Sequence, residues 1–261
     1  VQTCALPILG ATYNPFVVDS NGNIRNLDFG IEQNRMMDRL QMLQSIETKF
    51  IDEKRGSLAS DHFKILNKTV KIMSTDQMNS FKVNKEPKEI QERYGNTSFG
   101  RGCLMARRLV EIGVPFIEVD LGGWDNHTDI FATLSERKLP ELDQAMSALV
   151  EDLEQRGLLD NTAIIWMGEF GRTPNINGNT GRDHWARSWS VVVGGAGFKS
   201  GITVGETNED GKEIIGEAYT SQDLMASVLK SLDISLETIF TSKNGRPMKI
   251  ANSGRVINEL F

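Results

Sequence analysis

Two glycine-rich segments of the sequence carry side chains that are suited to bind a metal ion. Asp125 and His127 lie in the run GGWDNH, and Asp183 and His184 lie in the run GRDHW. Glu169 lies between them, in the run GEFGRTP. Carboxylate oxygens and imidazole nitrogens are ligands for divalent cations, and glycine lets the backbone turn sharply beside a ligand. The residue types therefore indicate a Zn²⁺, Mn²⁺ or Ca²⁺ site; the alternative is a capped turn, a packed histidine and an ion-paired loop.

The composition limits how such a site can be built. The chain has 261 residues with two cysteines, Cys4 and Cys103, and three histidines. Two cysteines are too few for a cysteine-based zinc cluster, so a metal site must rely on carboxylates and histidines. The third histidine, His62, lies beside the apolar stripe of a predicted helix and is interpreted as a helix-surface or core-edge residue.

The charge and hydropathy patterns argue against a nucleic-acid partner and against a membrane span. The net charge is −6, from 29 basic and 35 acidic residues. Nucleic-acid-binding proteins usually carry a basic surface, so we expect no nucleic-acid partner. No apolar run reaches the roughly 18 to 20 residues of a membrane helix, so we expect no membrane span.

Arg172 and Arg182 lie next to the candidate metal ligands. A guanidinium group can hold an anion through two parallel hydrogen bonds, so we expect Arg172 and Arg182 to bind an anionic substrate. We also expect Asp183, which is next to Arg182, to line that site. The alternative is that both arginines form surface ion pairs. Arg107 and Arg108, on a predicted helix, are interpreted as a solvated helix face.

The candidate ligands follow two predicted strands. Residues 114–121 and 162–167 are rich in β-branched and aromatic residues, and the amphipathic helix of about 133–155 lies between them. A strand–helix–strand unit predicts parallel strands with a right-handed crossover. Residues 162–167 form a continuous apolar run, which is typical of a strand buried on both faces.

Ligands of open parallel sheets bind beyond the carboxyl ends of the strands. Asp125, His127 and Glu169 should therefore meet at one edge of the sheet. His184 precedes a further predicted strand at 189–193, so a parallel arrangement would place it at the wrong edge. It can join the site only if that strand is antiparallel or if the loop doubles back.

The rest of the chain is mainly helical in its periodicity. Residues 74–96 are polar and interrupted by Pro87, which indicates a connection with helical fragments. Thr220 and Asp223 resemble a capping box at the start of the last helix. The other predicted helices span about 31–54, 58–73, 99–112 and 221–232.

The first eight residues resemble the translation of a sequencing-library adapter. We expect residues 1–8, including Cys4, to be an artefact and the natural protein to be truncated at its N-terminus. Cys103 would then be the one native cysteine of the chain.

Several ordered motifs resemble a known family. They are Tyr94-Gly95 with residues 106–111 and Gly113-Val114, then residues 123–127, 169–174, 181–185 and 194–197. Together they are similar to the bacterial family of domain of unknown function 1501, a sulfatase-like branch of the alkaline phosphatase superfamily. The resemblance implies an α/β/α sandwich with a mostly parallel sheet, two divalent metals at the strand ends, and phosphate or sulfate esters as substrates, glycan esters included.

The resemblance also implies roles for individual residues. Asp125, His127 and His184 look like the ligands of one metal. The second metal of the superfamily is held by an early Asp and an Asp-His pair, but Glu169-Phe170 stands here, and Phe170 cannot bind metal. The second site is therefore altered or absent, and Glu169 is either a ligand or a general base to a metal-bound water.

Residues 9–261 would then be the C-terminal portion of one sulfatase-like domain. Its parts are a helical segment of about 30–112, a metal-site core of about 114–200 and a C-terminal segment of about 201–261. The nucleophile would lie upstream, so no catalytic residue is assigned and the chain alone is expected to be inactive. The expected function is metal-dependent hydrolysis of phosphate or sulfate esters; the alternative is a non-catalytic binding protein. Family resemblance implies export, and the oligomeric state stays open.

Overall fold

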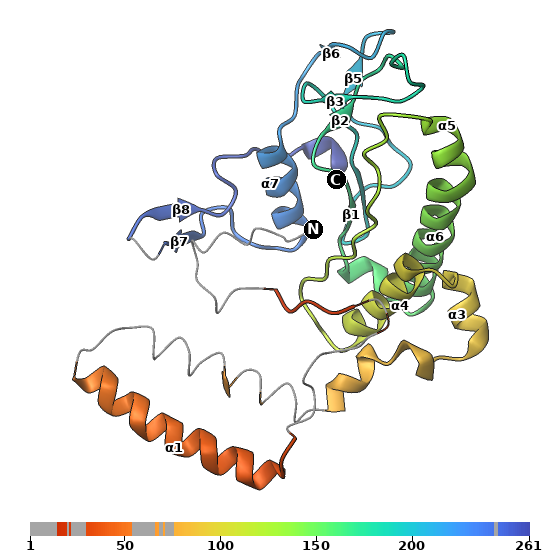
Figure 1. Ribbon diagram of the computed structural model, residues 1–261. Coiled ribbons are helices and arrows are strands. Elements are labelled where there is room, and N and C mark those ends of the chain that lie inside the picture. Colours follow the sequence, from red (N-terminus) through yellow and green to blue (C-terminus); the bar gives the residue numbers. More distant parts are fainter. Residues whose placement is uncertain are drawn as a thin grey trace. The chain divides into compact units, whose positions relative to one another are not determined.

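The computed structural model describes residues 15–19, 21, 30–53, 66–67, 70, 76–242 and 245–261. The chain divides into two compact units, Val1–Pro87 and Lys88–Phe261 (Figure 1). The adapter-like residues 1–8 and His62 lie outside the described residues. Of the helix expected at 58–73, only residues 66–67 and 70 are described, and these are helical.

The first unit contains the predicted helix near residue 31. It is α1, Gln33–Asp52, and it is followed by two short 3-10 helices, η2 (Asp76–Phe81) and η3 (Val83–Lys85). Leu40 is buried on α1. The short helices agree with the helical fragments expected at 74–96.

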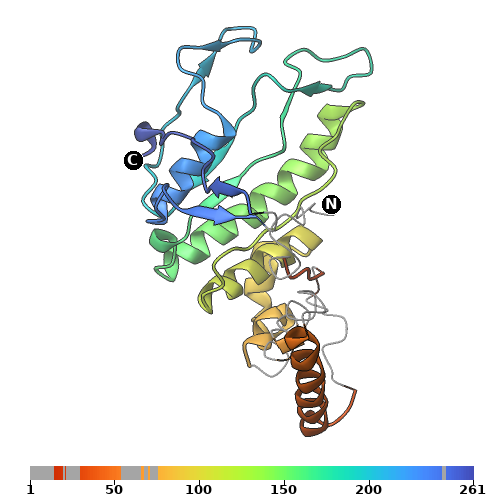
Figure 2. The same ribbon diagram turned by 90° about the vertical axis from the view of Figure 1, so that its left-hand side faces the viewer.

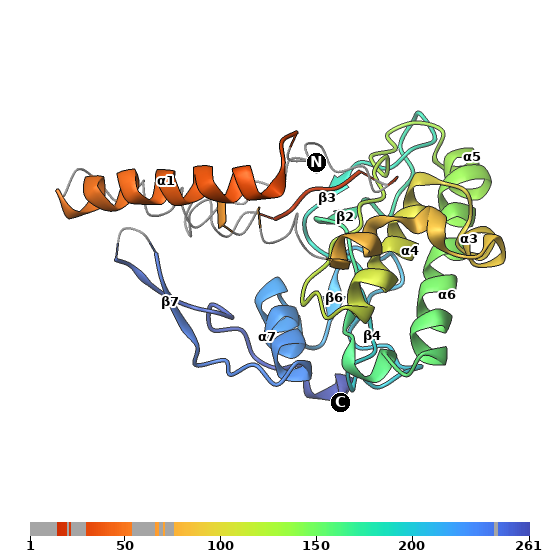
Figure 3. The ribbon, with the colours of Figure 1, turned by 90° about the horizontal axis from the view of Figure 1, so that it is seen from below.

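The second unit is built around a helical layer. Thr97 accepts a hydrogen bond from the backbone of Gly100 and so caps α4, in agreement with the helix expected at 99–112. α4 and α6 pack against each other and α3 packs on both (Figures 2 and 3). The helices are α3 (Lys88–Tyr94), α4 (Ser98–Glu111), α5 (Ile130–Thr133), the π-helical turn η4 (Leu134–Lys138), α6 (Leu139–Gln155), the 3-10 turn η5 (Leu159–Asn161), α7 (Ser221–Ser231) and the 3-10 turn η6 (Asn258–Leu260).

Arg107, Tyr94 and Arg156 surround the carboxylate of Asp152 and join these helices. The interpretation of Arg107 as part of a solvated helix face is therefore wrong. Arg107 is 1% exposed, and its Nε lies 3.0 Å from Oδ2 of Asp152. Tyr94 donates its hydroxyl to the same oxygen at 2.9 Å, and Arg156 binds the other oxygen at 2.8 Å. A buried guanidinium is tolerated only when a carboxylate neutralises it, and α6 supplies that carboxylate. Burial opposes ionisation of Asp152, but the hydrogen bonds from Arg156 and Tyr94 and the charge of Arg107 hold its pKa below the ordinary value.

The strands of the second unit form short antiparallel pairs. The chain is therefore a mixed helix and strand protein, but the mostly parallel sheet that was expected is wrong for the described residues. The pairs are β1 (Ile164–Trp166) with β4 (Val192–Gly194), β2 (Gly171–Arg172) with β3 (His184–Trp185), β5 (Glu206–Thr207) with β6 (Ile214–Ile215), and β7 (Ile239–Thr241) with β8 (Pro247–Lys249).

The strand predicted at 114–121 is not a strand in the described part of the chain. β-branched residues favour an extended backbone, but a strand also needs a neighbouring ladder, which depends on distant residues. Val119 instead packs closely on α4 at Gly102. The approach is so close that a Cβ added to Gly102 would lie 2.8 Å from Cγ1 of Val119. The expected double burial of β1 is also wrong, because Trp166 is 42% exposed.

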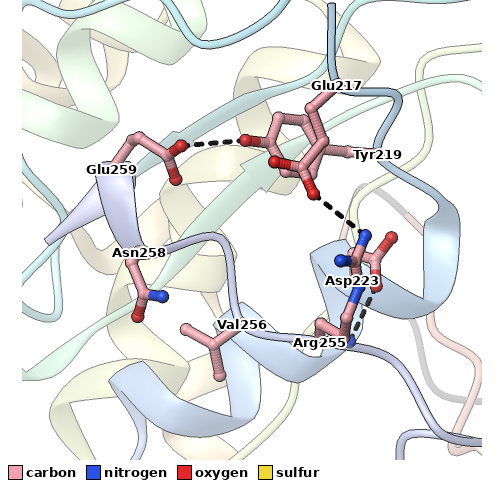
Figure 4. Close-up of a pocket in the computed structure, with 7 residues that line it drawn as sticks. All are labelled: Glu217, Tyr219, Asp223, Arg255, Val256, Asn258 and Glu259. Atoms are coloured by element: carbon pink, nitrogen blue, oxygen red, sulfur yellow. Dashed lines mark hydrogen bonds and ion pairs between the residues drawn. The ribbon is translucent and has the colours of Figure 1, made fainter.

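The last helix begins as expected. Thr220 and Asp223 form a capping box at the start of α7, and Asp223 also accepts the backbone N–H of Arg255 at 2.7 Å. A pocket lies beside this helix start, where Tyr219 donates to Glu259 at 3.0 Å and Arg255 pairs with Glu217 at 3.0 Å (Figure 4). Among the described helices, none has the length and apolar character needed to cross a bilayer.

Candidate metal centre

Two loops far apart in the sequence are joined edge to edge. The backbone N–H of Arg182 donates to the carbonyl of Asn126 at 3.0 Å, and that of Ile130 donates to Thr180 at 2.9 Å. Thr128 and Thr180 form an antiparallel bridge between these two bonds. The loop after residue 121 is therefore held against the loop that carries Asp183 and His184.

Gly181 makes this close approach possible. It is buried, and a Cβ at this position would lie 2.0 Å from the carbonyl carbon of His127 and 2.5 Å from the backbone nitrogen of Thr128. Both neighbours are backbone atoms that cannot rotate away. Any residue larger than glycine would therefore force the two loops apart.

A two-residue antiparallel pairing brings His184 to the same place. β2 pairs with β3 so that Arg172 is opposite His184, and the backbone N–H of Thr173 donates to Asp183 at 2.8 Å. The chain thus doubles back after β2, which is the condition under which His184 can join Asp125. The strand that follows, β4, is also antiparallel to β1.

Three of the predicted ligands converge. Oδ1 of Asp125 lies 2.8 Å from Nε2 of His184 and 3.0 Å from Nε2 of His127. The three ligand atoms all lie within 4.8 Å of one another. The side chains are 58%, 52% and 44% exposed respectively, so the group is open to solvent. Glu169 is not part of this group.

Asp183 contacts His127 from the opposite side of the ring. Its Oδ1 lies 2.8 Å from Nδ1 of His127, and it also accepts a hydrogen bond from Nδ2 of Asn177 at 3.1 Å. His127 therefore lies between two carboxylates, one at each ring nitrogen.

The charges of the group reinforce one another. The contact with Asp183, and more weakly that with Asp125, raises the pKa of His127 above its ordinary value. The hydrogen bond with His184 lowers the pKa of Asp125, and the hydrogen bonds with His127 and Asn177 lower that of Asp183. Both carboxylates are thus held in the ionised form that a metal ligand or a hydrogen-bond acceptor needs.

Arg172 lies beside the group. Its Nη2 is 3.4 Å from Oδ1 of Asp125 and 3.4 Å from Oε1 of Glu169, and its guanidinium stacks on the ring of Phe170. Contacts of 3.4 Å are long for hydrogen bonds to a carboxylate. Within the described structure its Nε has no hydrogen-bond partner. That Nε is buried, so the donors of Arg172 nearest the group are those at Nη2, which make only the two long contacts.

Arg182 is placed differently from Arg172. Its Nη1 donates to the backbone carbonyls of Thr173 and Pro174. These bonds fix the loop that follows β2 to the loop that precedes β3. The structure thus brings together Asp125, His127, His184, Asp183 and Arg172, links Glu169 to them through Arg172, and turns Arg182 to the backbone.

The donor set fits a divalent cation. Two imidazole nitrogens and one carboxylate oxygen are the ligands of many catalytic zinc sites, which leave a further position for water or substrate. Metal–ligand bonds of about 2.1 Å at tetrahedral angles place ligand atoms about 3.4 Å apart, so small movements of the three side chains would suffice.

Sequence reasoning missed the residues that support the ligands. Asn177 binds both loops, and the ring of Phe170 lies 4.8 Å from that of His184. Phe170 lies inside the motif of residues 169–174, and the sequence shows of it only that it cannot bind metal. Asn177 gave no signal, because asparagine in a loop is common.

Comparison with known proteins gives a family and no closer relative. No curated protein and no solved structure matches this chain. A family model described as "Protein of unknown function (DUF1501)" matches residues 8–261, nearly the whole sequence. The chain belongs to this family of proteins of unknown function.

Proposed function

We propose that Asp125, His127 and His184 bind one divalent cation, and that this centre acts on phosphate or sulfate esters. The observation that carries the proposal is the convergence of one carboxylate oxygen and two imidazole nitrogens within 4.8 Å. These residues come from two loops that backbone hydrogen bonds hold together. The exposure of the group leaves it accessible to a cation and to a polar ligand from solvent.

The neighbouring Arg172 supports an anionic substrate. A bound cation would supply Lewis-acid polarisation of an ester oxygen. The guanidinium of Arg172 would bind a second oxygen and stabilise the charge that develops there. The 3.4 Å contacts with Asp125 and Glu169 keep Arg172 in place without using all its donors.

Glu169 has a separate role in this proposal. It lies outside the group of three and contacts Arg172, so we assign it to orienting that guanidinium or to accepting a proton from water. Among the described residues, Asp125, His127 and His184 are the one group of three candidate ligands, so the proposal concerns a single cation.

Metal binding is the first test. Zn²⁺ and Mn²⁺ are titrated into the metal-free chain by calorimetry, beside Asp125→Ala, His184→Ala and Asp143→Asn. Asp143 is an exposed carboxylate of α6 outside the group, so Asp143→Asn should bind like the parent. We expect one ion per chain, with affinity reduced at least about 100-fold in the two ligand variants. Equal affinity in all four proteins would refute the proposal.

Oxyanion binding is the second test. Phosphate, sulfate and vanadate are titrated into the metal-loaded chain and into Arg172→Ala. We expect binding that requires the metal and weakens in Arg172→Ala. Absence of oxyanion binding by a chain that binds metal would exclude the ester substrates.

A non-catalytic binding protein is the second candidate, because no residue of this chain is assigned as nucleophile. Turnover of 4-nitrophenyl phosphate and sulfate by the protein, lost in Asp125→Ala, would support the enzyme. Metal-dependent oxyanion binding without turnover by that protein would support the binding role.

A further inference from the structure

We propose that Asp183 is the positioning residue of His127 and that Asn177 holds Asp183 in place. The inference rests on the proposed metal site. In this inference Asp183 orients a metal ligand and does not bind the substrate.

The two nitrogens of His127 have different partners. Nε2 faces Oδ1 of Asp125 at 3.0 Å, on the side of the three converging ligand atoms. Nδ1 faces Oδ1 of Asp183 at 2.8 Å, on the other side of the ring. A carboxylate on the Nδ1 side accepts a hydrogen bond from Nδ1–H and so keeps the proton on Nδ1. In a neutral imidazole this leaves the Nε2 lone pair free for a cation.

Asp183 is itself restrained on both its backbone and its side chain. Its backbone N–H donates to Oγ1 of Thr173 at 3.1 Å, and its carbonyl accepts the backbone N–H of Thr173 at 2.8 Å. Nδ2 of Asn177 donates to its carboxylate at 3.1 Å. Hydrogen bonds from Asn177 and with Thr173 therefore hold the carboxylate that faces His127.

Asn177 joins both halves of the arrangement. Its Nδ2 also donates to the backbone carbonyl of His127 at 3.1 Å, and its Oδ1 accepts the backbone N–H groups of Asn179 and Gly181 at 2.9 Å each. The side-chain amide of Asn177 thus contacts the backbone of His127, the carboxylate of Asp183 and the loop that carries Asp183.

Direct contact of Asp183 with the substrate is less consistent with this geometry. A carboxylate would repel the phosphate or sulfate group that the centre is proposed to bind. Its acceptor Oδ1 is already engaged by His127 and Asn177.

The test is a double-mutant cycle on metal affinity. Zn²⁺ affinity is measured for the parent, Asp183→Ala, His127→Ala and the double variant, with Asp143→Asn as the matched exposed-carboxylate control. We expect Asp183→Ala to weaken binding about 10- to 100-fold in the parent and to cause little further loss in the His127→Ala background, because Asp183 acts through His127. Asp183→Asn, which keeps a carbonyl acceptor, should recover part of the affinity.

A spectroscopic readout separates positioning from a general structural role. Zinc on Nε2 would itself fix the proton on Nδ1, so the comparison is made by ¹⁵N NMR on the metal-free proteins at a pH where His127 is neutral. Nδ1 of His127 should carry the proton in the parent, whereas the imidazole of Asp183→Ala should divide between both tautomers, while thermal melting reports whether the variant is folded. Asn177→Ala should shift the same signal in a chain with an intact carboxylate.

The outcomes separate the two proposals. If the parent binds no metal, the proposed function and this inference both fail. If the parent binds metal but Asp183→Ala binds equally well, or loses the same affinity with and without His127, only the positioning role is overturned.

Discussion

Replacing Gly181 with alanine tests the contact between the two loops most directly. The added Cβ would lie 2.0 Å from the carbonyl carbon of His127, whereas ordinary contact begins near 3.4 Å. The two backbones must therefore separate by about 1.4 Å. No side-chain rotation can absorb this shift, because the opposing atoms belong to the backbone.

The separation breaks the hydrogen bonds that join the loops. The bond from Arg182 to Asn126 is 3.0 Å long and that from Ile130 to Thr180 is 2.9 Å long, so an added 1.4 Å takes both beyond hydrogen-bond range. The backbone N–H of Asp129 donates to Asn179 at 3.1 Å in the same contact, so at about 1 kcal/mol each the three bonds lost amount to about 3 kcal/mol. The displacement also moves His127 by a large fraction of a metal–ligand bond of about 2.1 Å. We expect Zn²⁺ affinity to fall more than about 100-fold.

Gly178→Ala is the matched control. Gly178 lies in the same loop, and nothing lies within 4 Å of a Cβ at that position. Both variants are compared with the parent by zinc calorimetry and by far-ultraviolet circular dichroism, which should stay unchanged because the helices lie elsewhere. Parental affinity in Gly181→Ala, or an equal loss in Gly178→Ala, would refute the reasoning.

Three further predictions concern the helical layer and α7. Asp152→Asn leaves the buried Arg107 without its carboxylate, so urea denaturation at pH 7 should show a loss of about 3 kcal/mol in the free energy of unfolding. Folding lowers the pKa of Asp152, so its contribution to the free energy of unfolding is complete above the ordinary pKa of 3.8 and is lost as the pH falls through the folded pKa. The difference in free energy of unfolding between parent and variant should therefore shrink below pH 3.8, and a difference that stays constant would contradict this. Burial raises the pKa of Cys103 to about 12, so in a Cys4→Ser chain this thiol should react with a disulfide reagent at pH 8 only after addition of urea; rapid reaction without urea would contradict its burial. Asp223→Ala removes the carboxylate half of the capping box and its hydrogen bond from Arg255, and should cost about 1 to 2 kcal/mol in thermal unfolding; an unchanged melting temperature would contradict this.

Helices were predictable because their signals are local. Thr220 and Asp223 lie three residues apart, and the predicted capping box is present in the structure. The apolar spacing near residue 31 and after Phe99 likewise agrees with α1 and α4. The burial of Arg107 has no such local signal, because Asp152, which neutralises it, lies on another helix.

Strand pairing was not predictable from local signals. The residues near Ile117 and Ile164 have the composition of strands, but composition does not specify a partner. The parallel arrangement was inferred from a crossover rule that assumes the two strands are neighbours in one sheet. β1 instead pairs with β4 in the opposite direction.

The metal ligands of the candidate centre could be predicted from the sequence, but the residues that hold those ligands in place could not. Asp125, His127 and His184 were recognisable by residue type and by family resemblance, and they converge in the structure. Asn177 and Gly181 act through backbone contacts with a loop some fifty positions earlier in the sequence. Such contacts have no local pattern that a sequence could display.

The joining of the two loops also affects the order of folding. The contact between Asn177 and His127 spans 50 residues, and that between His184 and Asp125 spans 59. Contacts between residues so far apart in the sequence close large segments of chain and form slowly. The centre should therefore assemble after the local helices. A cation that binds only the assembled centre would stabilise the native state by mass action, so added Zn²⁺ should slow unfolding more than it speeds folding.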